Sequence, residues 1–177
     1  MTVSASSSVR PIGPAHSTIR EGLIAGGLGA LAVALWFLLV DVIARRALHT
    51  PALLGALVSR TPDPIAASEG PNRLMFAALY TPIHFILFAL FGVLVVFLMH
   101  RAKKRPSLLM LALVLFAVFE GGFTGFVALL AQTALGDLAW YQVAIGNLLA
   151  VIVMAWYVWR CHPDVPAIWS RRMDVGG

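Results

Sequence analysis

Three strongly polar side chains stand in the middle of long apolar stretches of this sequence: His84, Glu120 and Asn147. Measured from the same side at about 1.5 Å per helical residue, His84 and Glu120 lie about 16 Å deep and Asn147 about 14 Å deep. A polar group that lacks a partner in hydrocarbon is costly, so such residues are candidates for function. Their similar depth predicts one intramembrane polar cluster.

Two neighbouring residues extend this predicted cluster. Tyr80 precedes His84 by four residues and Thr124 follows Glu120 by four, so each pair shares one face of a helix. An imidazole that faces a carboxyl forms either an ion pair or a neutral hydrogen-bonded pair, and the two groups can exchange a proton between about pH 5 and 8. A structural interhelical contact and a functional pair therefore both remain open for His84 and Glu120.

Metal, haem and nucleophilic chemistry fit these residues less well. No HExxH, ExxH or HxxxH motif occurs, so we expect no metal site and no resident cofactor. Haem held by two histidines needs a second deep imidazole, which only a dimer would supply through a second His84. There is no GxSxG motif and no serine near the depth of His84. An intramembrane enzyme, or an oligomer that binds metal or haem through Glu120 and His84, remains the alternative to a non-enzymatic protein.

A second polar group lies near the end of the first apolar stretch. Asp41 and Arg45 are four residues apart, and His49 follows one turn later. Such a spacing is typical of an ion pair at the membrane interface, which contributes tenths of a kcal/mol. The alternative is that Asp41, Arg45 and His49 form the outer mouth of a cavity that leads toward Glu120.

The composition predicts the elements that must position these residues. The 177 residues are 60% hydrophobic and 12% charged, whereas soluble domains are about 25% charged. Such a chain is neither a soluble globule nor disordered. Four apolar runs, about 22–43, 74–99, 108–131 and 138–159, are each long enough to cross roughly 30 Å of hydrocarbon. We therefore predict an all-α integral membrane four-helix bundle.

The distribution of basic residues predicts the orientation of this bundle. Cytoplasmic segments are enriched in Lys and Arg. Nine basic residues fall on one side of the four runs: Arg10, Arg20, Arg101, Lys103, Lys104, Arg105, Arg160, Arg171 and Arg172. Four fall on the other: Arg45, Arg46, Arg60 and Arg73. Both termini are therefore expected in the cytoplasm, with the inverted orientation as the alternative. We attribute the net charge of +5 to the basic residues that set this orientation, so no nucleic-acid partner is expected.

The remaining segments flank or connect the spans. Residues 1–16 read as a disordered cytoplasmic tail, 17–163 as the transmembrane domain and 164–177 as a second cytoplasmic tail. In the first loop, Thr50-Pro51 predicts the start of a short apolar helix, either interfacial or re-entrant, with Thr50 as its N-cap. The sequence TPDPIAASEGP that follows contains three prolines and is predicted to be loop.

Small residues recur at every fourth position in three of the runs. In lipid, close approach of helices depends on such residues. We expect them to pack helices within the protein or, alternatively, between copies of it. The positions are Gly22, Gly26, Ala30 and Ala34 in the first run, Gly121 and Gly125 in the third, and Gly146 and Ala150 in the fourth.

The stretches WFLLVDVIARRALHTPALLG and FEGGFTG resemble small four-helix bacterial inner-membrane proteins, over residues 20–163. The resemblance implies a bacterial inner membrane and no particular activity. Together these observations predict a multi-pass, non-enzymatic membrane subunit or a small binding or transport module. Its surroundings are the lipid bilayer and, as an open alternative, a homo-oligomer or larger membrane complex.

Overall fold

The computed structural model describes residues 18–102 and 139–161, and every element within these ranges is a helix. The helices are α1 (Thr18–Ile43), α2 (His49–Val58), α3 (Pro64–Glu69), α4 (Arg73–Ala102) and α6 (Ala139–Cys161). Three of the four predicted spans, 22–43, 74–99 and 138–159, coincide with α1, α4 and α6 to within a few residues. The fourth, 108–131, lies outside the described residues.

Helices α1, α4 and α6 are long and apolar enough to cross a membrane. Between 22% and 33% of the most apolar 18-residue window of each helix is buried within the protein. Large apolar side chains are instead widely exposed, for example Leu35, Leu90 and Ile152. Such surfaces are unfavourable in water and are compatible with contact to lipid.

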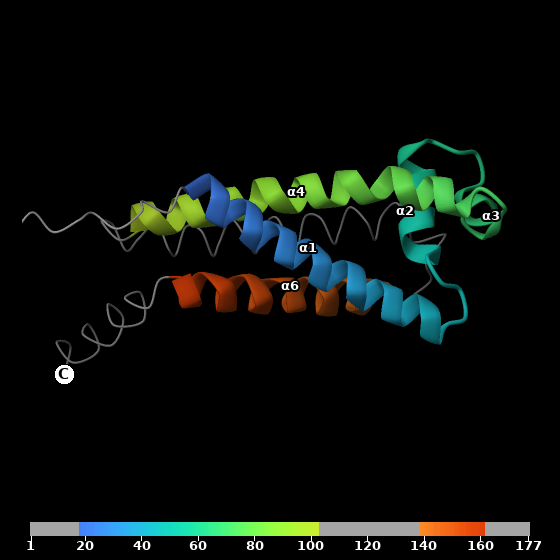
Figure 1. The fold of residues 1–177 in the computed structure, drawn as a ribbon. Helices are drawn as coiled ribbons and strands as arrows, with labels where there is room; N and C mark the ends of the chain where they lie inside the picture. Colours follow the sequence, from blue (N-terminus) through green and yellow to red (C-terminus); the bar gives the residue numbers. More distant parts are fainter. Residues whose placement is uncertain (1–17, 103–138, 162–177) are drawn as a thin grey trace, which may run out of the picture.

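Helix α1 is the central element of the described part (Figure 1). It crosses α4 obliquely and also packs against α6, while α2 packs against α4 and α3 packs against α2. The start of α1 and the ends of α4 and α6 lie at one end of the molecule, and α2 and α3 lie at the other (Figure 1).

Glycines allow α1 and α4 to approach closely. A Cβ atom on Gly22 would collide with the backbone of Val93, and one on Gly26 would collide with the carbonyl of Phe88. Gly92 on α4 meets the backbone of α1 at the same crossing. Side chains at these positions would therefore force the two helices apart.

The contact between α1 and α6 also depends on small residues. A Cβ atom on Gly29 would lie 2.8 Å from Sδ of Met154, and one on Gly146 would lie 3.0 Å from Cδ1 of Trp36. Ala30 and Ala150 are buried. Of the predicted packing positions, only Ala34 in the described part is half-buried, and it faces a cavity described below.

Two predictions for the first loop were wrong. The segment after α2 was expected to be loop, but Pro64–Glu69 form α3, because the Asp63 side chain accepts a hydrogen bond from the Ala66 amide at 3.0 Å and Pro64 fits the first turn. Thr50 was expected to be the N-cap of α2. The helix begins earlier, at His49, after Leu48 in a left-handed conformation with φ of 65°.

A polar contact joins the start of α1 to the end of α4. The His100 ring lies 3.3 Å from the hydroxyl of Thr18 through Nδ1 and 3.8 Å from the carboxylate of Glu21 through Nε2. Thr18 and Glu21 have the spacing of a capping box. In the folded protein both side chains therefore also reach a second helix.

Candidate functional site

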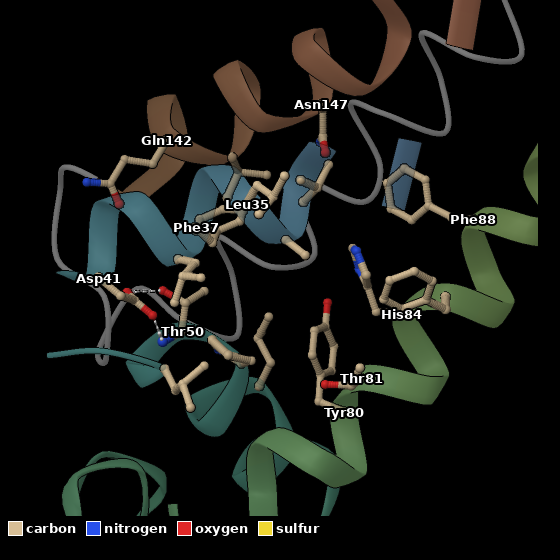
Figure 2. Close-up of a pocket in the computed structure, with 18 residues that line it drawn as sticks. Leu35, Phe37, Asp41, Thr50, Tyr80, Thr81, His84, Phe88, Gln142 and Asn147 are labelled. Carbon is tan, nitrogen blue, oxygen red and sulfur yellow. Dashed lines mark hydrogen bonds between the residues drawn. The ribbon is translucent and has the colours of Figure 1, made fainter. Parts of the chain in front are cut away.

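A cavity of about 240 Å³ lies between α1, α2, α4 and α6 (Figure 2). Most of its wall is apolar, and polar side chains reach it from each of these helices. Helix α1 contributes Val33, Ala34, Leu35, Phe37, Leu38 and Asp41 to the described wall. The segment from Leu48 into α2 contributes Leu48, Thr50, Pro51 and Leu54. Helix α4 contributes Tyr80, Thr81, His84, Phe85 and Phe88, and α6 contributes Gln142, Val143 and Asn147.

Asp41 and Thr50 close one side of the cavity (Figure 2). The Asp41 carboxylate accepts two hydrogen bonds from Thr50, one from the amide at 2.8 Å and one from the hydroxyl at 2.7 Å. Asp41 is 4% exposed, so these bonds to a charged group are shielded from competing water. One bond satisfies a backbone amide in the first turn of α2, and both hold α2 against α1. Because the Thr50 hydroxyl is bound to Asp41, it does not act as the cap of α2.

His84 lies on the opposite side, where it joins α4 to α1. Its Nε2 atom lies 3.1 Å from the carbonyl oxygen of Ala30. Because a carbonyl only accepts, Nε2 carries the hydrogen, and the lone pair of the neutral ring is left on Nδ1. The ring also contacts the Tyr80 ring, with centroids 5.7 Å apart, and the Phe88 ring, with centroids 4.8 Å apart.

Asn147 approaches the cavity from α6. Figure 2 shows its side chain extending toward the space that Tyr80 and His84 face from α4. Asn147 is 8% exposed, and its Nδ2 atom has no hydrogen-bond partner within the described residues. Nearby, the Trp36 indole donates to the backbone carbonyl of Gln142 at 2.8 Å, which fixes the start of α6 against α1.

The structure therefore brings four predicted polar residues, Asp41, Tyr80, His84 and Asn147, to the wall of one cavity. Glu120 lies outside the described residues, so its pairing with His84 stays a prediction. Other predicted residues that also lie there are Thr124, Gly121 and Gly125.

Arg45 and His49 are absent from the described wall of this cavity. Arg45 is exposed, with φ of 57° in the turn after α1, and the described residues contain no ion pair between Arg45 and Asp41. His49 is 5% exposed, and its Nδ1 lies 3.1 Å from the hydroxyl of Ser68, which donates to the Ile65 carbonyl. The His49 imidazole thus donates to Ser68 and ties α2 to α3.

The environment of His49 disfavours its charged form. Burial lowers the pKa of His49, and the nearby Arg46 guanidinium lowers it further, while Asp41 and Glu69 act in the opposite direction. A neutral ring suits a donor role toward Ser68, because one nitrogen keeps its hydrogen.

Sequence reasoning missed several residues of the cavity. Phe88 follows His84 by four residues, so its position on the same helix face was a usable signal. Thr81 and Gln142 line the cavity as well, but isolated residues of these types carry no distinguishing pattern. Gly92 was also missed, because no other small residue stands four positions away from it.

Within residues 18–102 and 139–161, no three His, Cys, Asp or Glu side chains are grouped so as to hold a metal ion. The chain matches no family model, no curated protein and no solved structure in the comparisons made. The geometry of the cavity is therefore the basis for a functional proposal.

Proposed function

We propose that this protein is a multi-pass membrane protein whose intramembrane cavity binds a small, largely apolar molecule, as a non-enzymatic binding or transport module. One observation carries the proposal: a cavity of about 240 Å³ between helices that are apolar enough to cross a membrane. Ligand pockets are typically apolar concavities with a few convergent polar groups, and the described wall has this character.

The size of the cavity supports a ligand of about one ring. An engineered apolar cavity of about 150 Å³ is large enough to bind benzene. The cavity here is larger, and the rings of Phe85 and Phe88 supply an aromatic surface on α4. An uncharged ligand of this size partitions into the bilayer and would enter the cavity from there.

The proposal includes the arrangement expected from the sequence. We propose that the apolar run 108–131 completes a four-helix bundle, that both termini are cytoplasmic and that the bilayer is a bacterial inner membrane. The support is the count of Lys and Arg along the sequence, nine in the segments predicted to face the cytoplasm against four in the first loop. Association into a homo-oligomer or a larger membrane complex is compatible with the exposed apolar faces.

Ligand-observed NMR with toluene tests the binding function. The purified full-length protein in detergent should show saturable toluene binding, which detergent alone does not. Ala34→Phe should weaken binding about tenfold or more by filling the cavity, while the matched variant Ala78→Phe, at an exposed alanine on α4, should leave it unchanged. The absence of saturable binding to the wild type, or equal binding by Ala34→Phe, would contradict the proposal.

A further inference from the structure

The amide of Asn147 is an unexplained polar group in the cavity wall. Its Nδ2 atom is buried and lacks a hydrogen-bond partner within the described part of the chain. A buried donor without an acceptor is destabilising, and such groups are rare in folded proteins. In Figure 2 the amide oxygen of Asn147 extends toward the cavity. Rotation about the last torsion of the side chain, which has a broad, two-fold profile, presents the NH₂ group there instead.

Several other polar side chains of the described wall are already engaged. The Asp41 carboxylate accepts from Thr50, the Thr81 hydroxyl donates to the Ala77 carbonyl, and His84 donates to Ala30. The Tyr80 hydroxyl, by contrast, extends toward the space between His84 and Asn147 (Figure 2). It adds an O–H donor to the described wall of the cavity.

We propose that the cavity selects an uncharged, ring-sized ligand with a carbonyl oxygen, which accepts a hydrogen bond from Asn147 and lies against the aromatic rings of α4. This inference rests on the proposed binding function and names the class of ligand: an aromatic ketone or a quinone-like ring. The carbonyl oxygen would accept from Asn147, and the ring would contact Phe85 and Phe88. A purely apolar ligand of the same shape would leave the Asn147 NH₂ group without an acceptor.

Two probes of nearly equal shape test this choice. Acetophenone carries a carbonyl oxygen where α-methylstyrene carries a CH₂ group, so the pair isolates the hydrogen-bond acceptor. Binding of each is measured by ligand-observed NMR against the full-length protein, with detergent alone as the reference for partitioning. The wild type should bind acetophenone about fivefold more tightly, the ratio expected for one net hydrogen bond.

Two amide variants on α6 assign the preference to a residue. Asn147→Leu should bring the affinities for the two probes to within about twofold and should retain binding of α-methylstyrene, which also reports that the cavity is intact. Gln142→Leu removes a different cavity amide and should keep the preference for acetophenone.

The outcomes separate the two proposals. Equal binding of both probes to the wild type, or an unchanged preference in Asn147→Leu, would overturn the carbonyl selection while leaving a binding cavity. Binding of neither probe to the wild type would overturn the proposed function and this inference with it. The comparison of probes on the wild type is decisive even where a variant fails to fold.

Discussion

His84 combines two roles within one imidazole. The Nε2 atom donates to the Ala30 carbonyl on α1, a contact that crosses between two membrane-length helices. Interhelical hydrogen bonds of this kind contribute about 0.6 kcal/mol on average in membranes, so the bond positions the ring more than it stabilises the fold. With Nε2 engaged, Nδ1 is the atom through which His84 can meet a ligand or the Glu120 carboxyl.

Asp41 makes a different interaction from the ion pair that its spacing to Arg45 suggested. The i,i+4 pattern indicated a surface ion pair, but the carboxylate turns inward to the amide and hydroxyl of Thr50. Hydrogen bonds to a charged group contribute about 1.5–3 kcal/mol each, more than an exposed ion pair on a helix does. The stronger and less exposed interaction therefore determines where Asp41 lies.

His49 gives a prediction for the dependence of α2 and α3 on pH. Burial and Arg46 lower the folded-state pKa of His49 below its usual 6.5. In the unfolded chain the ring binds a proton at higher pH than in the folded chain, so the unfolded state binds more protons. The stabilisation is therefore fully present above pH 6.5 and is lost as the pH falls toward the folded pKa.

Hydrogen exchange of the α2 and α3 amides, at about pH 7.5 and about pH 5.5 with correction for intrinsic rates, measures this effect. Wild-type protection should fall in acid. His49→Asn, which keeps a donor toward Ser68 without a titrating ring, should lose less protection over the same change. An equal loss in both proteins would assign the effect to other groups.

At the scale of elements, the crossing of α1 and α4 is the most sharply testable contact. Gly26 lies against the Phe88 carbonyl, whereas its neighbour Gly27 has open space where a Cβ atom would stand. Gly26→Ala should lower the free energy of unfolding by about 1–3 kcal/mol through overpacking. Gly27→Ala should be neutral or stabilising by up to about 1 kcal/mol, because alanine favours a helix over glycine.

Reversible unfolding in detergent micelles measures both glycine variants under the same conditions. Because both substitutions add one methyl group to adjacent positions of the same helix, differences in helix propensity cancel. A loss of stability that is equal in Gly26→Ala and Gly27→Ala would show that the close approach of α1 and α4 does not limit stability.

The three long apolar helices of the described part were predictable from the sequence, whereas the ends of the short helices were not. Hydropathy alone located α1, α4 and α6, because a helix must satisfy its own backbone in lipid. In the first loop, prolines suggested a loop, but Asp63 and Pro64 together form an effective start for α3. Thr50 had the right residue type for a cap, yet its hydroxyl donates to the carboxylate of Asp41, nine residues earlier, and does not cap α2. Only the fold brings these two residues together.

The sequence pointed to some residues of the candidate site but not to the shape of the cavity. Counting along the helices placed His84 and Asn147 at one level, and both line the cavity. The partner of His84, however, is a backbone carbonyl, and every residue has one, so no side-chain pattern identifies it. The volume of the cavity depends on how Ala34, Val143 and the α2 residues pack, which the sequence pattern does not encode.

For the whole molecule, the arrangement in Figure 1 separates the basic residues into two groups. Arg20 near the start of α1, Arg101 in α4 and Arg160 in α6 belong to the end where α1 begins and where α4 and α6 finish. Arg45, Arg46, Arg60 and Arg73 belong to the opposite end with α2 and α3. Within this second group, Arg46 lies 3.7 Å from the Glu69 carboxylate.

Over the whole sequence, nine basic residues in the tails and the second loop against four in the first loop predict the orientation of the protein. Positive charge close to the spans is retained in the cytoplasm, so a reporter fused after Lys104 and a reporter fused at the carboxyl terminus should both read cytoplasmic. A third fusion at Pro62, between α2 and α3, is the internal control and should read periplasmic. The same three readings exchanged would establish the inverted protein, in which Arg45 and Arg46 at the end of α1 prevail. If the Lys104 and carboxyl-terminal reporters fell on opposite sides, an odd number of crossings would lie between them, and the four-helix arrangement would be wrong.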